Sequence, residues 1–121
     1  MSFPLEVSSE VTSSETLRSV AQRYLAHCFA VETPPQANEL AAQLGVPPYR
    51  LTRMFLLELG TRPSAYLRDG QIRHAAMLLQ TELPTNEVAY RSGFVTRATF
   101  FRTFRRVAQT TPALYRRACK N

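Results

Sequence analysis

Residues 85–117, TNEVAYRSGFVTRATFFRTFRRVAQTTPALYRR, decide the fold that the sequence predicts. Val88 lies on the apolar face of a first predicted helix, and Gly93 follows where glycine can end a helix in the left-handed conformation. Phe100 and Phe104 are four residues apart and mark the buried side of a second helix. The opposite side of that helix carries Arg97, Arg102, Arg105 and Arg106. Two helices joined by a tight turn, the second with a basic outer face, predict a helix-turn-helix unit whose second helix enters the DNA major groove.

The same pattern occurs twice in the chain. Leu40 and Gly45 match Val88 and Gly93 at a separation of 48 residues. After the turn the separation becomes 49 residues, so the second turn is one residue longer than the first. The pairs at this separation are Leu51 with Phe100, Arg53 with Arg102, Phe55 with Phe104, Pro63 with Pro112, Tyr66 with Tyr115 and Arg68 with Arg117. One helix-turn-helix pattern is weak evidence, whereas two copies in register indicate a duplicated unit.

At these residues the chain resembles the DNA-binding region of the AraC/XylS family of bacterial transcription regulators, over about residues 17–117. The most specific matches are Gly93-Phe94, Phe100, Phe104, Pro112 and the run Tyr115-Arg116-Arg117. The resemblance implies an all-α fold of about seven helices, in which two helix-turn-helix units are joined by one long helix. It further implies that the two units enter successive major-groove segments of double-stranded DNA. The implied function is transcription regulation, usually activation by contact with RNA polymerase.

Three positions depart from the family pattern. Gln109 stands where the family often has glycine, and Gln71 stands where a basic residue is common. Ser92 fills a place that is usually apolar. These departures affect the expected local packing and one phosphate contact, but not the fold.

The charge of the chain is unevenly distributed. Residues 1–45 carry two basic and five acidic residues, whereas residues 46–121 carry 13 basic and four acidic residues. Lys120 is the only lysine. Arginine presents a planar fork that suits phosphates and guanine edges. A solubilising surface is the alternative explanation, but the placement of arginines on the second helix of each repeat favours nucleic acid.

The order of the elements follows from these patterns. We expect residues 1–14 to be a flexible lead-in or linker remnant and residues 15–121 to form the DNA-binding domain. Its parts are an initial helix to about residue 30, a first unit at about 37–60, a connecting helix at about 63–80, a second unit at about 84–107 and a C-terminal helix at about 111–120. The connecting helix would span about 27 Å. Gly70 inside it marks either a close contact with the first unit or a soft point.

In the first unit, Tyr49, Thr52 and Arg53 are the candidates for contact with DNA bases. Their spacing of i, i+3 and i+4 places them on one helix face. Arg53 can bridge O6 and N7 of guanine, and Thr52 can bond a base or touch a thymine methyl group. Tyr49 is either a base contact or an aromatic residue packed at the start of the helix.

In the second unit, the candidates for base contact are Arg97, Ala98, Phe101 and Arg102, which match the face that family members turn to DNA. Phe100 and Phe104 already occupy the core side, so Phe101 points elsewhere and needs an explanation. It contacts thymine methyl groups or packs against the connecting helix; both alternatives stay open.

A second group of residues is expected to contact the DNA backbone, which adds affinity but little sequence information. Its members are Arg50, Arg62, Arg91, Arg105, Arg106, Thr111, Arg116 and Arg117. Thr111 also fits a purely structural role, because it precedes Pro112 as a predicted N-cap and would bond an otherwise unpaired amide.

Other classes of protein lack support in the sequence. No apolar run approaches the 18 residues of a membrane span, and the N-terminus does not resemble a signal peptide, so we expect a cytoplasmic protein. Cys28 and Cys119 have no partners at metal-ligand spacing and are expected to be free thiols. His27, His74 and Glu87 lie on separate predicted elements without a nucleophile motif. We therefore predict no enzyme, no metal and no cofactor.

Two alternatives remain at this stage. The domain could belong to a longer regulator with a missing N-terminal sensing or dimerisation domain, because family members are commonly longer and residues 1–14 resemble a linker. The chain could also be a helical protein-interaction adaptor whose basic face meets an acidic partner. Salt-dependent affinity for duplex DNA would distinguish a DNA-binding protein from such an adaptor.

Overall fold

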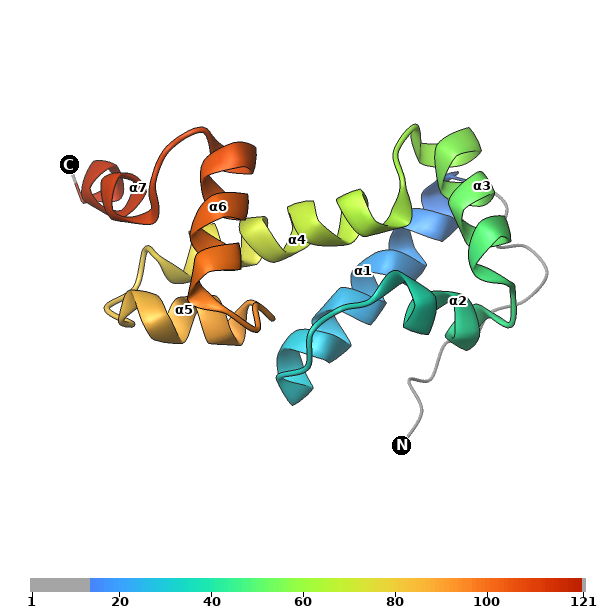
Figure 1. Ribbon diagram of the computed structural model, residues 1–121, viewed down its shortest axis with the longest axis horizontal. Coiled ribbons are helices and arrows are strands. Elements are labelled where there is room, and N and C mark those ends of the chain that lie inside the picture. The colour runs from blue at the N-terminus through green and yellow to red at the C-terminus, as the bar shows by residue number, and fades with distance from the viewer. Residues whose placement is uncertain (1–13, 121) are drawn as a thin grey trace.

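The structure, a computed structural model, describes residues 14–120. Seven helices and no strands occur within this range. In chain order they are α1 (Ser14–Val31), α2 (Ala37–Leu44), α3 (Pro48–Leu59), α4 (Pro63–Leu78), α5 (Thr85–Arg91), α6 (Arg97–Ala108) and α7 (Pro112–Cys119). Helix α4 joins two groups of helices that lie at its opposite ends (Figure 1). The all-α fold with two helix-turn-helix units and one connecting helix is thereby confirmed.

The first group consists of α1, α2, α3 and the start of α4. The apolar stripe of α1 packs against Leu40, Leu51, Phe55 and Leu67 from the other three helices. Tyr24 of α1 also supplies polar contacts to the start of α2. Its hydroxyl donates to Glu39 Oε1 at 2.5 Å and accepts the backbone N–H of Gln36 at 2.9 Å. Tyr24 of the neighbouring helix thereby pairs one amide at the start of α2, whose N-cap Gln36 makes no side-chain cap bond.

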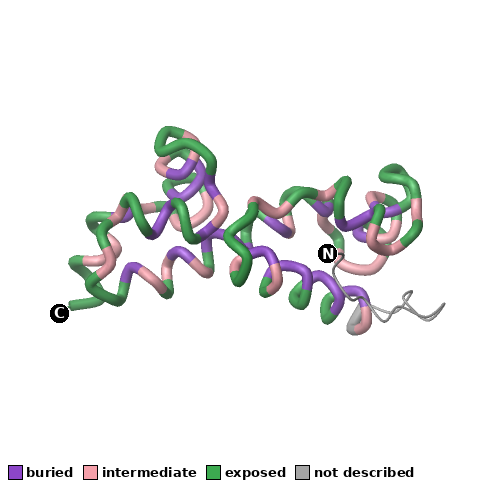
Figure 2. The backbone as a smooth tube through the Cα atoms, turned by 90° about the horizontal axis from the view of Figure 1, so that it is seen from below, coloured by how far each residue is buried: buried purple, intermediate pink, exposed green. Residues whose placement is uncertain are grey.

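The second group consists of α5, α6, α7 and the later part of α4. Its buried cluster contains Ile72, Ala75 and Leu79 of α4 together with Val88, Ala89, Phe94, Phe100 and Phe104. Phe104 also meets the ring of Tyr115 from α7, edge to face, at 5.8 Å between centroids. Figure 2 shows buried segments along the inner sides of the helices in both groups. The domain therefore has two small cores that share a single helix.

Gly70 lies in α4 between the residues that serve the two cores. A Cβ atom added there would be 2.5 Å from Leu25 Cδ1, and Leu25 is buried in α1. The structure supports a close contact at Gly70, as one of the two explanations expected, but the partner is α1 and not the first helix-turn-helix unit. The small residue allows α1 to approach α4 directly.

Gln71, next along α4, ties the connecting helix to the turn of the second unit. Its buried side-chain amide donates to the carbonyls of Ser92 and Gly93 at 3.0 and 3.1 Å. Gly93 has φ of +87°, and a Cβ there would be 2.9 Å from Pro35 Cδ in the loop before α2. Both helix groups thus meet at this turn. Because its side-chain amide points inward, Gln71 has a structural role at the position where a basic residue is common in the family.

The other two departures also have visible local consequences. Ser92 is fully buried, and its hydroxyl has no hydrogen-bond partner among the described residues. Gln109 caps the C-terminus of α6 with φ of +60°, a left-handed conformation that favours glycine. The unpaired buried hydroxyl of Ser92 and the positive φ of Gln109 each cost free energy of folding, and the fold tolerates both.

Several expected boundaries shift. Residues 1–13 of the expected lead-in lie outside the described residues, whereas residue 14 already belongs to α1. Helix α1 ends one residue later than expected, before Glu32 in a left-handed conformation. Helix α4 ends at Leu78 and not at residue 80, because the following backbone forms a turn that α7 holds in place. Its 16 residues span about 24 Å.

Replacing Gln71 with alanine should lower the free energy of unfolding by about 1–3 kcal/mol, because two carbonyls near the end of α5 lose their buried donor. Urea denaturation measures the change. The control is Gln80→Ala, at an exposed position just beyond α4, which should change stability by less than about 0.5 kcal/mol. Equal effects of the two variants would show that the Gln71 contacts add nothing to stability.

Replacing Gln109 with glycine should raise the free energy of unfolding by about 0.5–1 kcal/mol, because glycine adopts positive φ without steric cost. Gln109→Ala is the matched control and should give no such increase, since alanine keeps the Cβ. A glycine variant that is less stable than both would contradict the assigned cause.

Candidate nucleic-acid interface

The second helices of the two units, α3 and α6, lie at opposite ends of α4 and run in roughly the same direction in the view of Figure 1. Each buries one side in its own core through Leu51 and Phe55 in α3 and through Phe100 and Phe104 in α6. Each therefore turns its other side to solvent. The two outward sides together form the candidate interface.

The outward side of α3 contains all three residues that the sequence selected for base contact. Tyr49 is 75% exposed, which removes the alternative of a packed aromatic residue at the helix start. Arg53 is exposed, and Thr52 is half-buried with its hydroxyl donating to the Pro48 carbonyl at 3.2 Å. The Thr52 methyl group and a remaining acceptor lone pair are then the groups left for a base. Tyr49, Arg50, Arg53, Met54 and Leu57 line a concavity of about 380 Å³ beside the helix.

The outward side of α6 carries Arg97, Ala98 and Arg102, all of them exposed. Arg97 is held in place from two sides. Its Nη1 donates to Asn86 Oδ1 of α5 at 2.6 Å, and its guanidinium carbon lies 5.0 Å from the ring centroid of Phe101. A cation over an aromatic face is a favourable arrangement, so Arg97 is positioned before any ligand binds.

Phe101 has a packing role in the second core. The side chain is half-buried and packs on the second core, edge to face with Phe100 at 5.4 Å between centroids. It also lines a concavity of about 530 Å³ between α6 and the start of α7, together with Arg102, Arg105, Arg106, Thr111 and Pro112. The contact with Phe100 and the cover by Arg97 explain how the protein tolerates this ring near its surface.

Thr111, at the rim of the same concavity, is the N-cap of α7. Its hydroxyl accepts the backbone N–H of Leu114 at 3.1 Å, as the structural interpretation predicted. The three arginines of α6 that line the concavity bring positive charge to this helix start. An anion placed there would meet both the arginines and the positive end of the helix dipole.

The comparisons with known proteins agree with this geometry. A family model described as a helix-turn-helix domain matches residues 40–118. The HTH-type transcriptional regulator GlxA of Rhizobium meliloti is 37% identical over 89 residues, which make up 73% of this chain and 28% of GlxA. The regulatory protein SoxS of Salmonella typhimurium is 32% identical over 87 residues, 71% of this chain and 81% of SoxS. The chain belongs to the AraC/XylS family.

Solved structures of related domains have the same fold as this chain. The C-terminal domain of AraT, a response regulator from Geobacillus stearothermophilus, superposes with a TM-score of 0.71 at 30% identity, over 82% of this chain and 84% of that domain. The chain spans 28% of GlxA and 31% of the right origin-binding protein of Escherichia coli. It is thus a DNA-binding domain of the type found in AraC-family transcription regulators.

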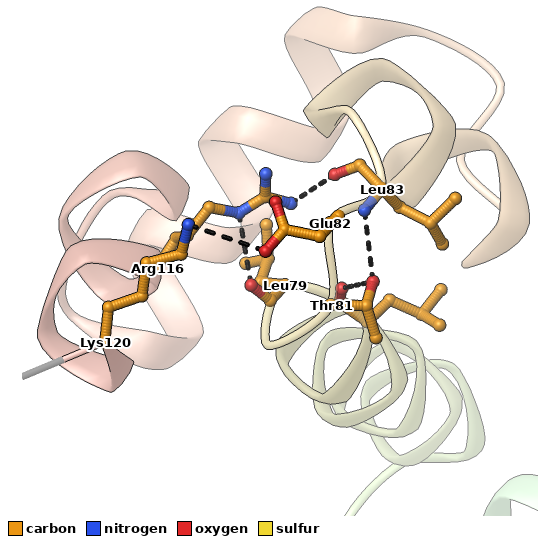
Figure 3. A network of polar contacts seen from close by, with 7 residues as sticks. Leu79, Thr81, Glu82, Leu83, Arg116 and Lys120 are labelled. Carbon is orange, nitrogen blue, oxygen red and sulfur yellow. Dashed lines mark hydrogen bonds and ion pairs between the residues drawn. The ribbon is translucent and has the colours of Figure 1, made fainter.

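Arg116 differs from its expected role in this AraC-type domain. Its Nε donates to the Leu79 carbonyl at 3.1 Å, and its Nη2 donates to the Leu83 carbonyl (Figure 3). The side chain is half-buried and holds the turn between α4 and α5 against α7. Nearby, Lys120 Nζ lies 3.9 Å from Glu82 Oε2. Because two of its donor groups serve the fold, we assign Arg116 a structural role in place of the phosphate contact expected from the sequence.

The other candidates for backbone contact lie at the surface. Arg50, Arg62, Arg91, Arg105, Arg106 and Arg117 are all exposed. Arg91 forms an ion pair with Glu87 one helical turn earlier, at 3.6 Å, with both side chains about half exposed. Exposed pairs of this kind contribute little stability, so a phosphate can replace Glu87 at low cost.

Sequence reasoning missed two residues that prepare the interface. Thr96 is the N-cap of α6, and its hydroxyl accepts the Thr99 N–H at 3.1 Å. A threonine immediately before the predicted helix was the available signal. Asn86 orients Arg97 from another helix. Nothing in the sequence identifies that pair, because the contact depends on how α5 packs against α6.

Sites for other chemistry do not emerge in residues 14–120. No cluster there could hold a metal ion, and no helix there is long and apolar enough to cross a membrane. Cys28 is buried and Cys119 exposed. Burial raises the pKa of the Cys28 thiol, which disfavours the reactive thiolate. His74 stacks on Phe29 at 4.0 Å between ring centroids, and burial lowers its pKa.

Arg106→Ala should weaken binding to all duplexes alike and reduce the slope of log K against log salt by about one, because a phosphate contact releases counterions and carries no base identity. Arg106 lies at the edge of α6 and faces a shallow concavity that it shares with Arg68 and Asp69 of α4. The salt series is measured by fluorescence anisotropy. Arg23→Ala, an exposed arginine of α1, is the control and should leave the slope unchanged. An altered preference at one base position would instead make Arg106 a base contact.

Proposed function

We propose that the protein binds duplex DNA by inserting α3 and α6 into two successive major-groove segments on one face of the double helix. The observation that carries this proposal is the repetition of one unit, with exposed arginines on the second helix of both copies. Helix α4 spans about 24 Å. With the width of the docked helices added, the spacing approaches the 34 Å or so of one DNA turn.

In this arrangement two groups of residues have different tasks. The residues proposed to contact bases are Tyr49, Thr52, Arg53, Arg97, Ala98, Phe101 and Arg102. The residues proposed to contact the backbone are Arg50, Arg62, Arg91, Arg105, Arg106, Thr111 and Arg117. The exposure of the arginines and the concavities beside α3 and α6 support this division. Backbone contacts fix the register, and base contacts specify the sequence.

One chain holds both helix-turn-helix units, so binding does not require a second copy of the protein. The two units present different side chains, Tyr49 and Thr52 in one and Ala98 and Phe101 in the other. A single chain would therefore select an asymmetric site. This contrasts with dimeric helix-turn-helix proteins, whose twofold symmetry matches a palindromic operator.

In the complete regulator, RNA polymerase and an N-terminal sensing or dimerisation domain are the further partners that we propose. Support comes from relatives such as GlxA, of which this chain matches only 28%. SoxS, matched over 81% of its length, shows that a regulator of this family can also be little longer than the matched region. Transcription of a promoter carrying the selected site, with purified polymerase, tests the first partner.

The test of DNA binding is selection of sites from random duplexes, followed by footprinting. We expect protection of one face over about 15–20 base pairs, with two major-groove contacts about 10 base pairs apart. Methylation interference confined to one half-site would reject simultaneous entry of both helices. Duplex affinity that is weak and independent of salt would favour the adaptor alternative, in which the basic face meets an acidic protein.

Arg102→Ala should relax specificity at one or two adjacent base pairs and leave the fold intact by circular dichroism. Arg102 and Arg53 each follow a buried core residue by two positions, which turns both away from the core. A bidentate contact with guanine contributes about 1–3 kcal/mol of discrimination.

The double variant with Arg53→Ala tests whether the two contacts are independent. Its effect on binding free energy should be close to the sum of the single effects, because the contacted sites are about one DNA turn apart. If Arg102→Ala instead unfolds the domain and leaves the surviving specificity unchanged, Arg102 is a structural residue and α6 docks with another face.

A further inference from the structure

The last turns of the two proposed recognition helices carry different kinds of side chain, apolar in α3 and basic in α6. In the internal repeat, Leu56 and Leu57 of α3 occupy the places of Arg105 and Arg106 of α6. Leu57 is 75% exposed and Leu56 44% exposed, although both belong to the outward side of a helix with basic residues. A leucine cannot bond a phosphate. The last turns of α3 and α6 therefore cannot make the same contacts with a duplex.

Leu57 shares its surroundings with the residues proposed to contact DNA. It follows Arg53 by four positions, so the two side chains are neighbours on one helix face. Both line the concavity of about 380 Å³ that also includes Tyr49, Arg50 and Met54. Tyr49 and Leu57, each 75% exposed, thus place apolar surface next to two arginines.

We propose that Leu57 contacts the C5-methyl group of a thymine in the major groove and makes binding of the first half-site depend on that thymine. The inference rests on the proposed function. Thymine is the base whose major-groove edge carries a methyl group, and apolar side chains recognise it by contact. Arg53 would bind a neighbouring guanine while Leu57 covers the methyl group, so one face of α3 would read two kinds of base edge.

The charge around Leu57 favours DNA over an apolar protein partner. Arg50 and Arg53 are exposed and form no ion pair within residues 14–120. An apolar partner would have to bury these two cations without compensation, which is costly. A major groove offers phosphates at its rim and thymine methyl groups on its floor, so it satisfies the arginines and the leucine together.

The experiment replaces thymine by uracil, which removes only the methyl group. The duplex is the site selected by the wild-type chain, and the half-site of α3 is the one whose preference changes in Arg53→Ala. Each thymine of that half-site is replaced singly. One replacement should weaken wild-type binding about fourfold, the amount expected for one methyl group removed from water. The same replacement should leave the affinity of Leu57→Ala unchanged.

Two further variants keep the result interpretable. Val31→Ala truncates another exposed apolar residue, at the end of α1, and should keep the wild-type sensitivity to uracil. Leu57→Arg copies the residue found at the equivalent place in α6. It should steepen the salt slope by about one unit and lose the sensitivity to uracil. Circular dichroism verifies that the Leu57 variants fold, as their exposure predicts.

Several outcomes would overturn the assignment of Leu57. These are a half-site without thymine, a wild-type protein indifferent to every uracil, or a Leu57→Ala variant as sensitive as wild type. In each of them a two-groove footprint can persist, which leaves the proposed function standing. Loss of the wild-type footprint would reject the proposed function itself, and Leu57 with it.

Discussion

The hydrogen bonds from Gln71 to the Ser92 and Gly93 carbonyls are the constraint on which the rest of the structure depends. Two cores joined by one helix could move independently, and α3 and α6 would then lose a fixed separation. The buried amide of Gln71 fastens α4 to the turn of the second unit, and Pro35 of the loop before α2 packs against Gly93. A side chain larger than hydrogen at residue 93 would push these groups apart. The spacing of the recognition helices therefore depends on the close contacts of Gln71 and Pro35 with the turn at Gly93.

The arginines of the chain show why net charge alone says little about contact with DNA. Arg116 carries the same charge as its neighbour Arg117, yet two of its donor groups bond carbonyls between α4 and α5. Arg97 is intermediate, because Asn86 and Phe101 fix its position and still leave it exposed. Exposed arginines without such partners keep their side-chain entropy until they bind. A fixed arginine loses less entropy on binding, which favours a directional contact with a base.

The sequence predicts the parts of this molecule that repeat or follow helical periodicity. The duplicated apolar pattern gives both helix-turn-helix units and the outward faces of α3 and α6, because those depend on local spacing. Residues whose role depends on a distant partner could not be assigned in the same way. Gln71 resembled a missing phosphate contact, and Arg116 resembled a present one, until the packing of α4 against α5 and α7 was known. For Gly70, the sequence allows either a close contact with another element or a soft point in the helix. Only the position of Leu25 in the structure shows that it is a close contact.

Duplication of a unit does not make its two copies equivalent. The core positions of the copies match in kind, since Leu51 and Phe100 must each fill the same place in a core. The outward positions are free of that requirement. Some of them match, as Arg53 and Arg102 do, and others differ, with Leu57 at the place where α6 has Arg106. Differences at exposed positions such as Leu57 and Arg106 would let the two units contact different half-sites. With the proposed function, a chain of this kind would gain an asymmetric site, and hence a direction along the DNA, without a second subunit.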